Sequence, residues 1–180
     1  ITMLLAVFTL TSCDDFLDIT PTGKVIAKTG KEYRALLTYE YKNFPEDRGL
    51  STLRGDEMTL SNASTSEEDR NSYLDIWAWK DGEQQSTTVS FGWRRYYHAI
   101  YIANYIIEHQ ASITEATTDE INQMVGEAYM MRAYCHFLLA NLYAEPYTHC
   151  NPATTRGIPL SLKADVNAVL SCSSLETVYQ

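Results

Sequence analysis

The sequence predicts an all-α fold of stacked helical hairpins joined by long irregular loops. Two long segments, 88–110 and 119–144, place apolar residues three and four positions apart, which is the spacing of one face of an α-helix. A linker of about eight residues, 111–118, joins the segments and makes the two helices antiparallel neighbours. Since each helix has an apolar side that must be buried, we expect the pair to pack together and against further helices.

A shorter helix is predicted ahead of this pair, over about 30–42. Thr29 followed three residues later by Glu32 is a capping box, which marks a helix start. An amphipathic stripe follows it, formed by Tyr33, Leu36, Leu37 and Tyr41.

The stretch from Asn43 to about Gln85 shows no sustained helical period and predicts a long irregular loop. Trp77 and Trp79 argue against disorder, because disordered segments are poor in aromatic residues. If the chain is extended there, the two rings point to the same face, together with Tyr73 and Asp75. Two interpretations stay open: a docked loop that packs its rings inward, and an exposed platform that stacks on a sugar.

The first long helix carries a polar residue on its apolar stripe. The stripe consists of Trp93, Tyr96, Tyr97, Ile100, Ala103 and Ile107, and Asn104 lies on the same side. A buried amide must find hydrogen-bond partners, so we expect Asn104 to bind loop backbone rather than a ligand.

The second long helix has clear boundaries. Thr117 and Glu120 form a capping box, Asp119 favours the positive end of the helix dipole, and Pro146 ends the helix. Cys135 lies on its apolar stripe, which predicts a buried, inert thiol.

The region after Pro146 predicts a loop with a short extended piece at 157–160. Ser173 and Glu176 then form a further capping box, and the helix that begins there is cut at Gln180. The predicted fold is therefore truncated at its C-terminus.

Composition and motifs argue against several functions. The net charge is −9 and no run of five or more basic residues occurs, which disfavours nucleic-acid binding. No G-x-S-x-G, P-loop or H-E-x-x-H motif is present, and no His or Cys pair has metal-ligand spacing, so we predict no enzyme, no metal and no cofactor. Acidic clusters lie in polar loop, where solvated charge is expected: Asp56-Glu57, Glu67-Glu68-Asp69 and Asp81/Glu83. A disulfide between Cys150 and Cys172 stays open.

The first residues have the features of an export signal. Residues 1–12 are apolar and uncharged but too few to span a bilayer, which fits a signal peptide. Leu10-Thr11-Ser12-Cys13 looks like a bacterial lipobox, in which the chain is cut before the cysteine and Cys13 is acylated. Several acyl chains on one residue hold a protein at a membrane. The alternative is a buried N-terminal strand with an incidental cysteine.

These motifs, taken together and in order, resemble the SusD/RagB family of Bacteroidetes outer-membrane lipoproteins. The residues that carry the resemblance are Ser12-Cys13-Asp14-Asp15-Phe16-Leu17-Asp18, Pro21-Thr22-Gly23, Trp93, Tyr97, Ile100, Ala103-Asn104, Ile106-Ile107, Gly126-Glu127-Ala128, Arg132-Ala133, Tyr143, Pro146-Tyr147, Gly157-Ile158-Pro159-Leu160 and Val178-Tyr179. The resemblance implies a signal peptide at 1–12 and an incomplete N-terminal helical domain at 13–180. It also implies a tetratricopeptide-like scaffold, whose second-helix spacing Ala133, Phe137 and Ala140 keep.

Two functions follow as hypotheses. The resemblance implies a lipid-anchored, cell-surface protein of the outer membrane that binds a glycan or other nutrient and passes it to a SusC-like TonB-dependent transporter. We expect the ligand to contact Trp79, Trp77, Asp56 and Asn62. The alternative is a lipid-anchored helical-repeat scaffold that binds only protein partners. Exposed and coplanar rings of Trp77 and Trp79 favour the first hypothesis, and buried rings favour the second.

Overall fold

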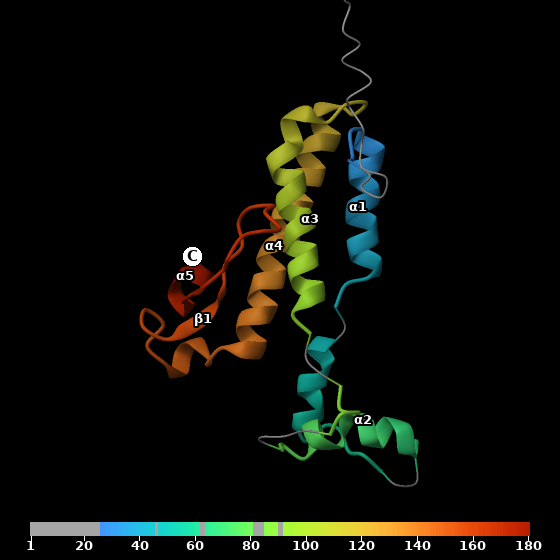
Figure 1. Ribbon diagram of the computed structural model, residues 1–180, viewed down its shortest axis with the longest axis vertical. Helices are drawn as coiled ribbons and strands as arrows, with labels where there is room; N and C mark the ends of the chain where they lie inside the picture. The colour runs from blue at the N-terminus through green and yellow to red at the C-terminus, as the bar shows by residue number, and fades with distance from the viewer. Residues whose placement is uncertain (1–25, 46, 62–63, 81–84, 90–91) are drawn as a thin grey trace, which may run out of the picture.

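Three helices lie side by side and form the body of the molecule (Figure 1). The structure is a computed structural model, and it describes residues 26–45, 47–61, 64–80, 85–89 and 92–180. The three helices are α1 (Gly30–Lys42), α3 (Arg94–His109) and α4 (Thr118–Tyr143). The last two form an antiparallel hairpin, joined through the short helix η3 (Gln110–Ser112), and α1 packs against both. The predicted all-α fold is therefore confirmed.

Two of the predicted helix starts are found as expected. Thr117 Oγ1 accepts a hydrogen bond from the Glu120 amide at 3.3 Å, and Glu120 Oε2 accepts one from the Thr117 amide at 2.8 Å. Thr29 and Glu32 form the same reciprocal pair at the start of α1. These bonds satisfy amide groups that have no partner inside the helix, which fixes where α1 and α4 begin.

The core lies between the three helices and consists of their apolar stripes. It contains Tyr33, Leu37, Tyr96, Ala99, Ile100, Ala103, Ile106, Met124, Ala128, Met131, Cys135, Leu139 and Ala140. The Cys135 thiol is fully buried, and burial raises its pKa to about 12. Because only the thiolate reacts readily, this agrees with the inert thiol that the sequence predicts.

A polar network attaches the C-terminal loop to the helical hairpin. Asn104 Nδ2 donates to the carbonyl oxygens of Ser161 and Lys163 at 3.1 and 3.2 Å. Arg132 Nη1 donates to Asn104 Oδ1 at 2.8 Å, and His136 Nε2 accepts from the Ser161 amide at 3.2 Å. The prediction that Asn104 binds loop backbone is therefore confirmed.

Between α1 and α3 the chain leaves the bundle, and residues 47–89 are here called the excursion. It contains the 3₁₀-helix η2 (Asp47–Arg54) and the helix α2 (Glu67–Trp77), both below the bundle in Figure 1. The prediction of an irregular loop is therefore wrong for residues 67–77. Ser66 caps α2 by accepting from the Asp69 amide at 3.0 Å, and the acidic cluster Glu67-Glu68-Asp69 forms its first turn.

The start of α3 also differs from the prediction. The helix begins at Arg94 rather than near Thr88. Thr88 instead belongs to the excursion, because its hydroxyl donates to the Asp75 carboxylate at 2.9 Å. This bond to α2 keeps residue 88 in the loop, so α3 begins only at Arg94.

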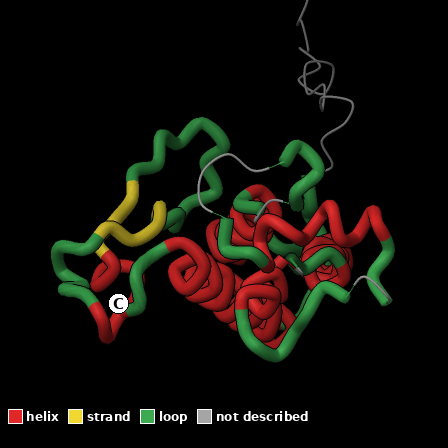
Figure 2. Tube along the Cα trace, turned by 90° about the horizontal axis from the view of Figure 1, so that it is seen from below, coloured by secondary structure: helices red, strands yellow, loops and turns green. Residues whose placement is uncertain are grey.

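The C-terminal region forms a small layer beside α4. The helix η4 (Tyr147–His149) leads to strand β1 (Arg156–Pro159), which pairs antiparallel with β2 (Cys172–Ser174), and α5 (Leu175–Tyr179) follows. Figure 2 shows this sheet at one side of the bundle. The predicted extended piece at 157–160 is thus largely strand. A Cβ atom on Gly157 would lie 3.1 Å from Leu175 Cα, which is tighter than most such contacts, so glycine lets β1 lie close to the start of α5 without displacing it.

Two further predictions about this region are settled by the structure. The cap of α5 is Ser174, which accepts from the Thr177 amide at 3.3 Å, so the predicted Ser173–Glu176 capping box is wrong by one residue. Ser173 lies in the middle of β2, where its backbone is extended in the sheet. Cys150 and Cys172 both carry free thiols, so the disulfide left open by the sequence is not formed.

Candidate ligand-binding site

The predicted ligand residues that the structure describes lie in the excursion. These are Trp77, Trp79 and Asp56, whereas Asn62 lies outside the described residues. The predicted signal peptide at 1–12 and the predicted lipid attachment at Cys13 also lie outside them.

Trp79 occupies an unusual backbone position just after α2. Its φ angle is 53°, in the left-handed region that favours glycine. The turn is a Schellman motif, because the Lys80 amide donates to the Asp75 carbonyl at 2.9 Å and the Trp79 amide to the Ile76 carbonyl at 3.2 Å. A left-handed conformation costs a side-chain-bearing residue roughly 1–2 kcal/mol. The turn therefore holds a bulky aromatic residue where a glycine would fit more easily.

The Trp79 ring is held in place from η2. Its indole N–H donates to the Arg54 carbonyl at 3.1 Å, and the Arg54 guanidinium carbon lies 4.9 Å from the ring centroid. This distance is within the range of a cation–π interaction. The side chain is nevertheless 61% exposed, so the ring is fixed and open to solvent at once.

The Asp75 carboxylate binds Gln85 and Thr88, which follow α2 in the chain. This buried carboxylate accepts hydrogen bonds from the Gln85 amide at 2.7 Å and from the Thr88 hydroxyl at 2.9 Å, and Lys80 Nζ lies 3.6 Å away. These contacts, the Gln85 amide first, lower the pKa of the Asp75 carboxyl below its usual value. The carboxylate therefore ties α2 to the segment that leads back to α3.

Of the remaining predicted site residues, Trp77 is placed differently from expectation, whereas Asp56 lies in a polar loop as expected. Trp77 ends α2 and is 37% exposed, so the extended geometry that would align it with Trp79 is wrong. Asp56 is exposed in the turn after η2, and it forms no hydrogen bond or ion pair with the part of the chain that the structure describes. The structure thus pairs Trp79 with Arg54, a contact between residues 25 positions apart that no local sequence pattern signals.

The described residues include neither a metal-binding cluster nor a helix that could cross a membrane. No group of three or more His, Cys, Asp or Glu side chains among them could hold a metal ion. None of the described helices has the length and apolar content that a membrane crossing requires.

This chain is similar to known proteins in sequence and in fold. A family model named SusD-like, with the description "Starch-binding associating with outer membrane", matches residues 15–180. A solved SusD superfamily protein from Bacteroides thetaiotaomicron has a similar fold, with a TM-score of 0.64 at 19% sequence identity. The alignment covers 84% of this chain and 34% of that one, so the chain spans about a third of that protein's length. No curated protein matches. Because the family model covers nearly the whole chain, this chain belongs to the SusD-like family.

Proposed function

We propose that this chain is part of a glycan-binding protein of the outer membrane, and that Trp79 forms a stacking surface for the sugar. The description of its family as starch-binding and associated with the outer membrane supports this proposal. The observation that carries it is the state of the Trp79 ring, which is 61% exposed although its backbone is strained and its edge is bonded to Arg54. Backbone strain of this kind concentrates at functional sites.

The bracing by Arg54 explains how the ring serves as a platform. A fixed aromatic ring loses little freedom when a ligand binds, so more of the contact energy appears as affinity. The flat apolar faces of sugars pack on such rings, and hydroxyl groups around them find polar partners. We propose three further residues that contact the ligand: Trp77 at the end of α2, Asp56 and Asn62.

The same proposal covers anchoring and transfer. The lipobox at residues 10–13 supports a lipid anchor on Cys13 after removal of residues 1–12, and thus a place on the cell surface. The resemblance to the SusD/RagB family supports a SusC-like TonB-dependent transporter as the partner that receives the glycan. The proposed role is binding and delivery without catalysis.

A second function, a scaffold that binds only protein partners, also has an observation in its favour. One side of α4 exposes large apolar side chains, with Met130 at 71%. The others are Tyr129, Tyr134 and Phe137. Exposed apolar patches of this kind often bind other protein surfaces.

Glycan binding by the intact protein, screened on an array and measured by calorimetry, tests the choice. We expect Trp79→Ala to lower the affinity for the most tightly bound glycan about tenfold, because roughly 1–1.5 kcal/mol of stacking energy is lost. Trp79→Phe should restore part of the affinity, and Tyr129→Ala, an exposed aromatic residue on α4, should leave it unchanged. Equal affinity of the Trp79→Ala variant and the parent contradicts the proposed platform.

The scaffold hypothesis predicts a different outcome. In that case the intact protein binds no glycan on the array. Met130→Asp would then abolish capture of the partner, whereas Trp79→Ala would not affect it.

A further inference from the structure

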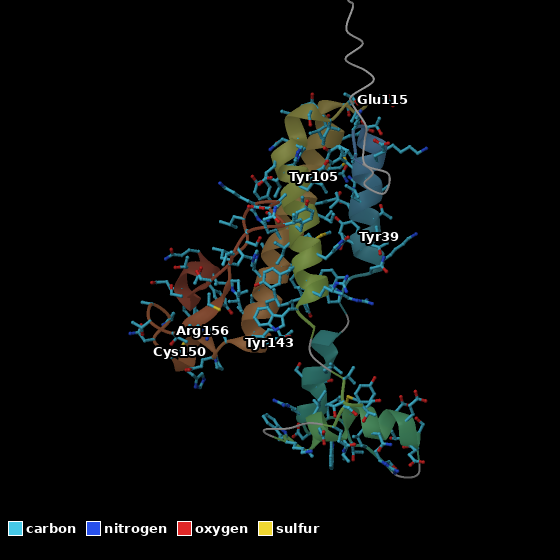
Figure 3. The ribbon with its side chains drawn as sticks, in the orientation of Figure 1. Tyr39, Tyr105, Glu115, Tyr143, Cys150 and Arg156 are labelled. Atoms are coloured by element: carbon cyan, nitrogen blue, oxygen red, sulfur yellow. The ribbon has the colours of Figure 1, made fainter. Side chains whose placement is uncertain are left out.

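A polar cleft of about 350 Å³ lies between the last turns of α1 and the first turns of α3. It is lined by Tyr39, Glu40, Asn43, Arg94, Arg95 and His98, and thus shares no residue with the surroundings of Trp79. Figure 3 labels Tyr39 on α1, in the bundle and above the excursion. The volume is in the range of small-molecule sites.

One side of the cleft is cationic although the chain carries a net charge of −9. Arg94, Arg95 and His98 belong to consecutive turns of α3, so their side chains project from neighbouring positions. Both arginines are exposed, and neither side chain forms a hydrogen bond or ion pair with another described residue. Exposed guanidinium groups of this kind can bind an anionic partner.

The floor of the cleft is a buried carboxylate. Glu40 lies on the core-facing side of α1 together with Tyr33 and Leu37, and it is only 4% exposed. A carboxylate at such a position needs a partner, and Glu40 Oε1 lies 3.0 Å from His98 Nδ1. This contact fixes the orientation of the imidazole, so Nε2 remains for a ligand. The Glu40 carboxylate also supplies a hydrogen-bond acceptor at the base of the cleft.

The opposite side adds an aromatic face and an amide. Tyr39 is 58% exposed, and Asn43 Nδ2 donates to the Tyr39 carbonyl at 2.8 Å, which leaves Asn43 Oδ1 as an acceptor. Hydroxyl groups of a sugar need both donors and acceptors, and its apolar face needs an aromatic ring. Two guanidinium groups add a preference for an anionic substituent, since arginine binds carboxylate and sulfate oxygens with charge-assisted hydrogen bonds.

We infer that this cleft binds an acidic saccharide, whose anionic group lies against Arg94 and Arg95 and whose ring lies against Tyr39. The anionic group is a carboxylate or a sulfate ester. The inference goes beyond the proposed function and does not depend on Trp79.

Calorimetry on the intact protein with three disaccharides tests the inference: one with a uronic acid, one with a sulfate ester, and their neutral counterpart. We expect an acidic disaccharide to bind, and Arg94→Gln with Arg95→Gln to weaken it at least tenfold. Arg94→Lys with Arg95→Lys keeps the charge but not the forked geometry, so an intermediate loss is expected. The matched control is Arg156→Gln with Lys163→Gln, which removes the same charge from exposed residues outside the cleft. Thermal melting verifies that each variant is folded.

The outcomes separate this inference from the proposed function. Binding of the uronic acid alone or of the sulfate ester alone supports the inference and identifies the anionic group. Equal loss in the cleft variant and in the control overturns it, because binding then follows general charge. Failure of all acidic disaccharides to bind, or equal binding of the neutral one, overturns it as well. Trp79→Ala should leave acidic binding unchanged, so failure of the Trp79 platform remains a separate result.

Discussion

The helical bundle and the excursion are stabilised in different ways. The bundle buries continuous apolar stripes from α1, α3 and α4, whereas the buried apolar side chains of the described excursion are Leu53 and Ile76. In place of a core, the excursion relies on polar contacts to Asp75 and on the contact between Arg54 and Trp79. The bundle thus provides rigidity, and a weakly packed segment held by specific polar contacts presents the exposed ring. Binding residues commonly lie on loops that a rigid scaffold positions.

Core substitutions should show the largest difference between the two regions. Leu139→Ala removes a fully buried side chain of α4, so we expect a loss of about 2–5 kcal/mol in the free energy of unfolding. Urea unfolding of the intact protein measures this loss. Leu162→Ala, at an exposed position, is the control and should change it by less than about 0.5 kcal/mol.

Ile76→Ala provides the matching test in the excursion. Because the excursion has few buried apolar contacts, we expect this variant to raise amide hydrogen exchange in α2 while the global unfolding midpoint stays near that of the parent. If Ile76→Ala lowers global stability as much as Leu139→Ala does, the excursion and the bundle unfold as one unit and the comparison is wrong.

The next largest effect is expected at the polar network of the bundle. Asn104→Ala leaves the Ser161 and Lys163 carbonyls and the Arg132 guanidinium without their bonds to this amide. Unsatisfied buried groups cost about 1–3 kcal/mol, and urea unfolding measures the loss. Asn141→Ala on the exposed side of α4 is the matched control. A loss no greater than that of the control would show that the network contributes little to stability.

Sequence reasoning succeeded where local signals and burial agree. The capping boxes at Thr29 and Thr117 fixed two helix starts, and the polar Asn104 on an apolar stripe correctly indicated bonds to loop backbone. It failed at α2, because a helix of 11 residues whose buried side is Asp75 and Ile76 shows no apolar period. The Ser66 cap and three acidic residues after it were the available signal.

The candidate site was less predictable than the fold. The choice of Trp79 as a ligand residue rested on residue type; the ring is exposed, and its contact with a ligand stays a prediction. Its partner Arg54 and its left-handed backbone depend on how η2 meets the end of α2, which is a tertiary property. The expected alignment of Trp77 with Trp79 assumed an extended chain, and the helix overrode it.

The pH dependence of stability should report on His136 in the bundle. Burial lowers the pKa of this imidazole, so the folded state favours the neutral form, whose Nε2 accepts from the Ser161 amide. A lowered folded pKa means that the unfolded state binds the proton more tightly. Stability is then full above the unfolded value of about 6.5 and falls as pH decreases through the lowered folded pKa. Urea unfolding between pH 7.5 and 5 should show this loss.

His136→Gln removes the titrating group while keeping an acceptor for the Ser161 amide. We expect the stability of this variant to change less across the same pH range. An unchanged pH profile would show that other groups, such as the carboxylates with lowered pKa values, produce the dependence.

The smallest expected effect compares the same backbone strain in both regions. Glu115, labelled in Figure 3 at the top of the bundle, has a φ angle of 54°, nearly equal to the 53° of Trp79. Glu115→Gly should relieve the strain and stabilise the protein by up to about 1 kcal/mol without changing glycan binding. Trp79→Gly relieves the same strain but removes the indole bond and the cation–π contact to Arg54, so we expect less than about 0.5 kcal/mol of net change. Thermal melting and glycan calorimetry on both variants measure these effects. If Trp79→Gly loses binding while its stability is kept, the strained tryptophan serves the ligand rather than the fold, whereas a large loss of stability would make Trp79 a structural residue.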